Sequence, residues 1–207
     1  MSEASVSAPR RSPWLYAIPL LMFAALAAVF AKGLFSGDAS KVPSALIGKP
    51  APAVTLAPLE GLQRDGRPVP TFDMADLAKG RATIVNVFAS WCAPCRAEMP
   101  ALDALQKQRG GEDFEVVAVN VDTGDDTKPK KFLAETGVES LAYYRDNTLA
   151  LFNDLKKRSL ALGLPVTLLI DDEGGLLAHM NGPAEWASPD ALRLVDAARG
   201  DTAPQAR

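Results

Sequence analysis

The chain is poor in the residues that bind transition metals. Its 207 residues include two cysteines and one histidine, His179. A structural zinc site takes about four Cys or His ligands, so we expect no zinc site and no resident cofactor. Both cysteines lie in one short motif, and cysteine content alone therefore does not identify the redox compartment of the protein.

The chain also lacks an excess of basic residues. Its 22 Lys and Arg residues are outnumbered by 25 Asp and Glu residues, which gives a net charge of −3 at pH 7. The basic runs at residues 128–131 and 156–158 are short. We interpret them as solvated helix faces, with steering of an acidic partner as the alternative. No basic stripe runs through the sequence, so nucleic acid is not expected as a partner.

The two cysteines belong to the motif Trp91-Cys92-Ala93-Pro94-Cys95. The apolar, β-branched run at residues 82–89 predicts a buried strand before the motif, and apolar residues at helical spacing over residues 96–106 predict a helix after it. Cys92 is therefore expected at a helix N-terminus, where free N–H groups and the helix dipole stabilise a thiolate. Such a position can lower a thiol pKa from about 8.5 into the range of roughly 3.5–7.5.

The spacing of the cysteines allows them to form a disulfide with each other. We predict that Cys92 is the exposed attacking thiol and that Cys95, one helical turn deeper, is the resolving thiol. The alternatives are half of a zinc site and a static structural disulfide. A bridge that closes so short a loop would stabilise the fold little, so we interpret the motif as a redox disulfide.

A stretch of eighteen residues without charge, residues 14–31, lies near the N-terminus. At about 1.5 Å per residue a helix of this length spans about 27 Å, close to the hydrocarbon core of a bilayer at roughly 30 Å. Arg10 and Arg11 precede it, so the positive-inside rule places residues 1–13 in the cytoplasm. We predict a single-pass inner-membrane anchor, a polar linker at residues 32–45, and a catalytic domain in the periplasm. The alternative is a cleaved signal peptide.

The remainder of the chain alternates between strand and helix patterns, which predicts an α/β fold. We expect a folded domain over residues 46–199, with a β-hairpin around the turn at residues 64–67, and a disordered tail at residues 200–207. The other expected strands cover residues 114–121, 141–144, 166–170 and 176–180, and the other expected helices cover residues 73–79, 128–136, 149–162 and 189–198.

The strand, the Cys-x-x-Cys motif and a later Gly-Leu-Pro-Val-Thr run at residues 163–167 together resemble the thioredoxin superfamily. The resemblance implies a thioredoxin-like fold with an N-terminal β-hairpin extension and an inserted helical and strand segment. It also implies that Pro165 is a cis-proline beside the disulfide and that the backbone of Leu164 pairs with an extended substrate. Trp91 would shield the sulfur and contact a partner; the alternative is a core aromatic residue, and the two roles are compatible. Pro94 would lie just inside the helix start, where its missing N–H costs little.

Two families of membrane-anchored periplasmic reductases share features with this chain. Residues 46–52 and 86–92 resemble the cytochrome c maturation thioredoxin (DsbE/CcmG type), whereas residues 96–102, 119–122 and 181–188 resemble the TlpA thioredoxin of alphaproteobacteria. The first resemblance implies apocytochrome c as the protein substrate, and the second implies a copper chaperone or an oxidase subunit. Reduced protein would be regenerated by a membrane electron donor of the DsbD or CcdA type.

The chain departs from each family at one point. Val166 follows Pro165 where the cytochrome c maturation family carries an acidic residue, and the second cysteine pair of the TlpA prototype is absent. Our main interpretation is a reductant in copper delivery to cytochrome oxidase, with reduction of apocytochrome c as the alternative. A copper-binding chaperone and a dithiol oxidase are further alternatives. The neutral Ala93-Pro94 pair predicts a potential nearer to the roughly −270 mV of thioredoxin than to the roughly −120 mV of DsbA.

One acidic residue near the motif is a candidate proton carrier. Asn86 stands where ordinary thioredoxin carries a buried aspartate, so the nearest acid by sequence is Glu98, three residues after Cys95. The family resemblance also implies a functional glutamate at this position. We predict that Glu98 helps to move the proton of Cys95; the alternative is a solvated helix carboxylate.

Overall fold

The structure is a computed structural model that describes residues 18–28, 51–64, 67–74 and 80–199. The chain divides into two compact units, Met1–Pro43 and Ser44–Arg207. In the first unit, residues 18–28 are helical and their side chains are exposed. Within the described residues, no helix is both long enough and apolar enough to cross a membrane. Both ends of the predicted anchor lie outside these residues, as do the predicted linker and tail, so these assignments remain predictions.

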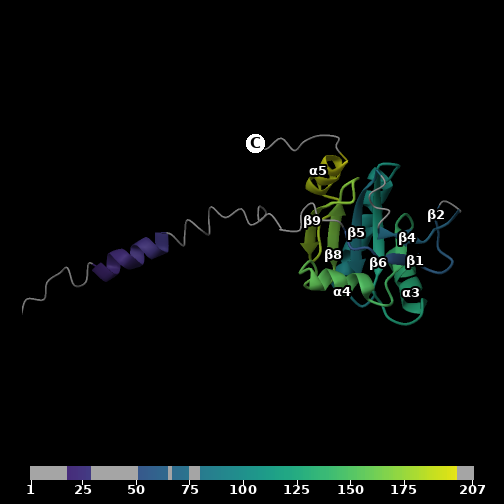
Figure 1. The fold of residues 1–207 in the computed structure, drawn as a ribbon, viewed down its shortest axis with the longest axis horizontal. Helices are drawn as coiled ribbons and strands as arrows, with labels where there is room; N and C mark the ends of the chain where they lie inside the picture. The colour runs from purple at the N-terminus through teal and green to yellow at the C-terminus, as the bar shows by residue number, and fades with distance from the viewer. Residues whose placement is uncertain (1–17, 29–50, 65–66, 75–79, 200–207) are drawn as a thin grey trace, which may run out of the picture. The chain divides into compact units, whose positions relative to one another are not determined.

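The second unit is built on a mixed sheet of seven strands in the order β4-β1-β7-β6-β5-β8-β9 (Figure 1). The strands are β1 (Thr55–Pro58), β4 (Phe72–Asp73), β5 (Ala82–Phe88), β6 (Phe114–Asn120), β7 (Ala142–Arg145), β8 (Val166–Ile170) and β9 (Leu176–Asn181). The central strands β5 and β6 are parallel and buried along their whole length. Continuous apolar sequences suit such strands because both faces of the sheet are covered.

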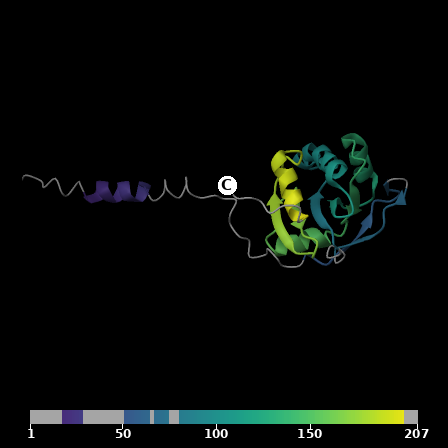
Figure 2. The same ribbon diagram turned by 90° about the horizontal axis from the view of Figure 1, so that it is seen from above.

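Among the described residues, four helices pack on this sheet: α2 (Ala93–Arg109), α3 (Thr127–Thr136), α4 (Ala150–Lys157) and α5 (Pro189–Ala198). Figure 2 shows α2, α3 and α5 on one face and α4 on the other. The predicted helix over residues 149–162 is wrong at its C-terminal end, because α4 stops at Lys157. Ser159 adopts a left-handed conformation with φ of 59°, and Leu160 turns into the core instead of continuing the helix.

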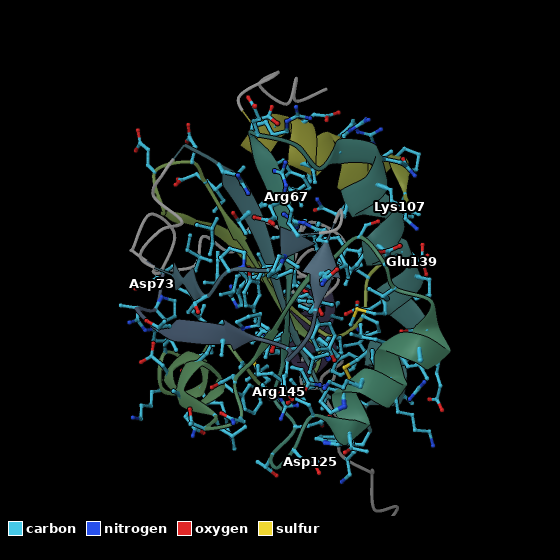
Figure 3. The ribbon with its side chains drawn as sticks, turned by 90° about the vertical axis from the view of Figure 1, so that its right-hand side faces the viewer. Arg67, Asp73, Lys107, Asp125, Glu139 and Arg145 are labelled. Atoms are coloured by element: carbon cyan, nitrogen blue, oxygen red, sulfur yellow. A yellow bond between two sulfur atoms is a disulfide. The ribbon has the colours of Figure 1, made fainter. Side chains whose placement is uncertain are left out.

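The N-terminal hairpin extension is confirmed. Strand β2 (Gln63–Arg64) pairs antiparallel with β3 (Arg67–Pro68), and farther from the turn β1 pairs antiparallel with β4. Arg67 and Asp73 mark this region in Figure 3. The helix predicted over residues 73–79 falls largely outside the described residues. The inserted segment is also present: α3 and β7 follow β6, and β7 extends the sheet parallel to β6.

Candidate active site

The Cys-x-x-Cys motif lies where β5 passes into α2, as the sequence predicted. A tight turn follows β5, in which the N–H of Cys92 donates to the carbonyl of Ala89 over 3.1 Å. Cys92 is the N-cap of α2, and its sulfur accepts a hydrogen bond from the N–H of Cys95 over 3.3 Å. A negative charge on this sulfur would face the positive end of the helix dipole, which favours the thiolate.

Cys92 and Cys95 are joined in a disulfide. Cys95 is fully buried, whereas Cys92 is 5% exposed. The predicted order of accessibility is therefore correct, but the prediction that Cys92 is exposed is wrong in degree, since the turn and helix cover most of it in the disulfide form. Thiol–disulfide exchange requires access of the attacking sulfur, so an incoming partner can meet only Cys92.

Three apolar side chains near the redox motif and the cis-proline are exposed on the surface of this unit. Trp91 is 75% exposed, so the alternative that it fills the core is wrong. Pro94 is also exposed and lies in the first turn of α2. Leu162, which the sequence did not single out, is 84% exposed. Large exposed apolar residues of this kind suit a surface that contacts other proteins.

The peptide bond between Leu164 and Pro165 is cis, as the family resemblance implied. Strand β8 starts directly after it and pairs antiparallel with β5, with Val166 opposite Val87. This register places Pro165 one step beyond the last pair, at the edge of the sheet where β5 passes into the cysteine turn. The structure thus brings together two segments about seventy residues apart in sequence. Their roles in binding a substrate remain predictions.

Glu98 is buried, with 3% of its surface exposed, so the alternative that it is a solvated helix carboxylate is wrong. Its Oε1 accepts a hydrogen bond from Nδ2 of Asn86 over 2.8 Å. Its Oε2 accepts from the N–H of Ala184 over 3.1 Å and from Nε1–H of Trp186 over 3.2 Å. Burial raises the pKa of Glu98 above its ordinary value, although the three hydrogen bonds act in the opposite direction.

The position of Glu98 on α2 relates it to the buried cysteine. Residues three apart on a helix lie on the same face, with Cβ atoms about 5–6 Å apart, so Glu98 and Cys95 share the buried face of α2. A carboxylate whose pKa is raised binds a proton more readily than an exposed carboxylate does. The role of Glu98 as a proton carrier is consistent with this placement and remains a prediction.

The partners of Glu98 could not be found from the local sequence. Asn86 replaces the aspartate of ordinary thioredoxin, and the sequence does not show that it contacts Glu98. Its Nδ2 also donates to Oγ1 of Thr167 over 2.9 Å, while its buried Oδ1 has no partner among the described residues. Trp186 is 88 residues from Glu98. The run at residues 181–188 carried a family signature, and nothing in it indicated a contact with α2.

The disulfide at a helix N-terminus and the cis-proline at the same sheet edge identify the class of protein to which this unit belongs. They make this unit a thioredoxin-like thiol:disulfide oxidoreductase whose active site is the Cys92–Cys95 pair.

The chain belongs to the Redoxin family, whose model matches residues 46–195. It is similar to the thiol:disulfide interchange protein HelX of Rhodobacter capsulatus, with 37% identity over 167 residues, covering 80% of this chain and 85% of HelX. It is 35% identical to the thiol:disulfide interchange protein DsbE of Escherichia coli K12 over 165 residues, covering 76% of this chain and 79% of that protein.

A solved structure agrees with these similarities. The crystal structure of a thiol:disulfide interchange protein of the thioredoxin family from Chlorobium tepidum TLS superposes with a TM-score of 0.56 at 29% identity, covering 73% of this chain and 96% of the other. The two relatives named above are a HelX and a DsbE protein. They favour the resemblance to the cytochrome c maturation thioredoxins over the resemblance to TlpA, which was our main interpretation.

Proposed function

We propose that this protein reduces the disulfide between the haem-attachment cysteines of an apocytochrome c. The observation that carries the proposal is the similarity to DsbE and HelX over more than three quarters of the chain, at a site with a disulfide at the N-terminus of α2. Reduction of apocytochrome c was the alternative interpretation of the sequence, and the similarity to these relatives supports it better than it supports the copper pathway.

The reaction proceeds by two exchange steps. In the reduced protein, the Cys92 thiolate attacks one sulfur of the partner disulfide; that bond breaks, a mixed disulfide forms, and the released partner thiolate takes up a proton. Cys95 then loses its proton and attacks the sulfur of Cys92. The Cys92–Cys95 disulfide forms, the second partner thiolate leaves and is protonated, and two electrons have passed to the partner.

The second step requires a proton acceptor inside the protein, because Cys95 is fully buried. In the proposal Glu98 has this role, since it is buried on the same face of α2 and its pKa is raised by burial. Its hydrogen bonds to Asn86 and Trp186 hold the carboxylate in one orientation. Proton transfer by a positioned side chain typically contributes a factor of about 10²–10⁴ to a rate.

The partner would bind around Cys92 through surface groups. Trp91 and Pro94 offer exposed apolar contact area beside the sulfur. The backbone of Leu164, next to Pro165, pairs with an extended segment of the partner, as a strand added to the edge of a sheet.

In the same proposal the protein works at the inner membrane. Residues 14–31 anchor the chain, with the catalytic domain in the periplasm, and the support is the uncharged stretch preceded by Arg10 and Arg11. The disulfide formed in each cycle needs two electrons and two protons to be opened again. A membrane electron donor of the DsbD or CcdA type supplies these electrons.

One observation favours a second candidate, reduction of cysteine pairs in a copper chaperone or an oxidase subunit. Val166 follows Pro165, where the cytochrome c maturation family carries an acidic residue, and it is buried in β8. This departure from the cytochrome c maturation sequence weakens the assignment to apocytochrome c. The runs that resemble TlpA, including residues 181–188, point in the same direction.

Substrate trapping with the full-length Cys95→Ser variant separates the candidates. Without the resolving thiol, Cys92 stays joined to the partner in a mixed disulfide that can be isolated and identified. Capture of apocytochromes with Cys-x-x-Cys-His sites is the expected result. Capture of a copper chaperone or an oxidase subunit instead overturns the proposal in favour of the second candidate, and capture of neither class overturns both. A variant with both cysteines changed to serine is the control for non-covalent carry-over.

A further inference from the structure

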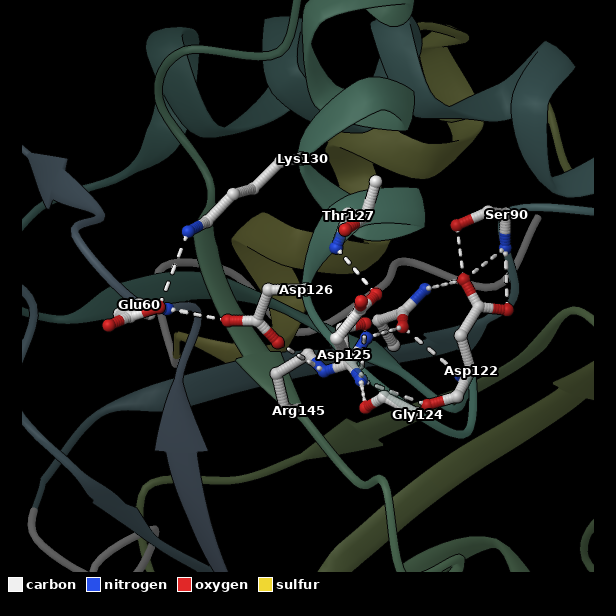
Figure 4. Close-up of polar contacts among 10 residues, drawn as sticks. Glu60, Ser90, Asp122, Gly124, Asp125, Asp126, Thr127, Lys130 and Arg145 are labelled. Atoms are coloured by element: carbon white, nitrogen blue, oxygen red, sulfur yellow. Dashed lines mark hydrogen bonds and ion pairs between the residues drawn. The ribbon is translucent and has the colours of Figure 1, made fainter.

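A buried guanidinium lies beside the turn that carries the redox pair. Arg145 is the last residue of β7 and is 6% exposed. Its Nη1 donates to Oδ1 of Asn120 over 2.8 Å, and its Nη2 lies 3.1 Å from the carbonyl oxygens of both Asp122 and Gly124 (Figure 4). Residues 121–126, which we call the β6 loop, follow β6 and contain no strand or helix. The guanidinium therefore satisfies carbonyl groups that this loop would otherwise leave unpaired.

The β6 loop in turn holds the redox turn. The carboxylate of Asp122 accepts hydrogen bonds from the N–H of Ser90 over 3.2 Å and from the Ser90 hydroxyl. Asn120 links the two parts of the network: its Oδ1 accepts from Arg145 and from the N–H of Asp122, and its Nδ2 donates to Oδ2 of Asp122 over 3.2 Å. An uninterrupted chain of hydrogen bonds thus runs from Arg145 to Ser90, two residues before Cys92.

The charges of the network are arranged around the same guanidinium. Nε of Arg145 lies 3.3 Å from Oδ1 of Asp126, and the other oxygen of that carboxylate accepts the N–H of Glu60 over 3.0 Å. Asp122 is buried, and Arg145 is the cation whose side chain contacts both the backbone of Asp122 and the carboxylate of Asp126. Removing one charge from such a group leaves the others uncompensated in a region of low dielectric constant.

We propose that Arg145 is a positioning residue of the redox pair: through Asn120 and Asp122 it fixes Ser90, and thereby the turn that sets Cys92 as the N-cap of α2. It does not touch either sulfur. The proposal concerns the chain's own disulfide, so it does not depend on which partner is reduced, and its test uses no protein partner.

The position of Cys92 as N-cap decides in which direction the loss of Arg145 shifts the thiol–disulfide equilibrium. The N–H of Cys95 points at the sulfur of Cys92, and this contact strengthens when the sulfur is a thiolate. If the turn loosens, the reduced form loses part of that stabilisation. Loss of the cation also leaves the negative charge of Asp122 less balanced beside the turn. Both effects disfavour the reduced form that carries the Cys92 thiolate, so Arg145→Met should shift the equilibrium toward the disulfide.

The test is the equilibrium of the Cys92–Cys95 pair with reduced and oxidised glutathione, measured on the full-length chain. We expect Arg145→Met to shift the equilibrium constant toward the disulfide by about tenfold, which corresponds to about 30 mV. Ser90→Ala removes only the hydroxyl contact with Asp122 and should shift the constant in the same direction by about threefold, or roughly 0.6–0.7 kcal/mol. Alkylation of Cys92 at pH 7 should slow in the same order.

Arg109→Met is the matched control. Arg109 is also an arginine in an ion pair, with Asp196 at 3.0 Å, but it lies at the far end of α2 from Cys92. Its variant should keep the wild-type equilibrium. If Arg145→Met and Ser90→Ala also keep it, the proposal is overturned, whatever happens to their urea midpoints, since a purely structural role moves stability alone.

Arg145→Lys provides a second variant should Arg145→Met fail to fold. A lysine keeps the charge, but its single nitrogen cannot reproduce the planar fork that contacts Asn120 and the loop carbonyls together. We expect a shift toward the disulfide that is measurable but smaller than the tenfold shift expected for Arg145→Met. With Arg145→Met unavailable, unchanged equilibria in both Arg145→Lys and Ser90→Ala overturn the proposal.

Discussion

Replacement of Glu98 by glutamine removes an ionisable group from the buried face of α2 with little change in shape. The new amide nitrogen would meet Nδ2 of Asn86, which also donates a hydrogen bond. Rotation of the Asn86 amide resolves this conflict, because its Oδ1 has no partner among the described residues and Thr167 can donate its hydroxyl proton instead. The rotated Nδ2 then takes the site of Oδ1, where no partner lies among the described residues, so we expect Glu98→Gln to fold at low pH at a cost of about 1–3 kcal/mol for the buried donor that is left unpaired.

The pH dependence of stability is where the variant should differ most. An unfolded glutamate titrates near pH 4.3, roughly its model-peptide value, and burial raises the pKa of Glu98 in the folded protein. Between these two values the folded state holds more protons than the unfolded state. The free energy of unfolding of the wild type therefore falls as pH rises through this window, by at most about 1.4 kcal/mol per pH unit. In Glu98→Gln no group titrates at this position, so its free energy of unfolding does not show this fall.

Urea unfolding of both proteins with the disulfide intact, between pH 4 and pH 8, measures the effect as a difference curve. Burial also raises the pKa of Asp146, but this group is present in both proteins and its contribution cancels. The variant should gain stability over the wild type as pH rises through the window, and the gain should then level off. A difference that stays flat across the range would refute the assignment of a raised pKa to Glu98.

The same variant tests the proton-carrier role. We expect Glu98→Gln to slow resolution of the mixed disulfide at least about 100-fold, at the low end of what a positioned acid or base contributes. Glu139→Gln is the control, because Glu139 is a largely exposed carboxylate with 80% of its side-chain surface accessible. If Glu98→Gln leaves both the cysteine pKa values and the rate of reduction at wild-type levels, Glu98 has no part in the chemistry.

Three further variants test individual contacts. Trp91→Ala should leave the urea midpoint unchanged, because the side chain is 75% exposed. Its kcat/KM for a protein disulfide should fall about 30-fold, the effect of losing a binding hot spot of about 2 kcal/mol. An unchanged kcat/KM would show that Trp91 does not contact the partner. Trp186→Phe removes the Nε1–H bond to Glu98, so it should lower the free energy of unfolding in urea by about 1–2 kcal/mol. Because that bond lowers the pKa of Glu98, its loss should also extend to higher pH the range over which stability falls. An unchanged range would contradict the geometry. Gly137→Ala should cost about 1 kcal/mol by the same assay, since Gly137 ends α3 at φ of 65°, and a neutral result would show that the turn relaxes.

The elements that the sequence predicted well are those encoded by neighbouring residues. Strand β8 has the predicted bounds, and β5 and α5 differ from prediction by one residue or less. Hydrophobic periodicity and caps such as Ser188 and Gly137 are local signals. The N-terminal position of Cys92 followed from the same signals, because it required only a strand before the motif and a helix after it.

The reactive motif, the α/β pattern and the family resemblance can be recognised in the sequence because each is carried by short runs of neighbouring residues. The tertiary structure alone decided the surroundings of the two cysteines. It buried Glu98 against Asn86 and Trp186, and it placed Arg145 against the β6 loop. These contacts join segments up to 88 residues apart. They are created by sheet order and helix packing, which no local pattern of side chains encodes.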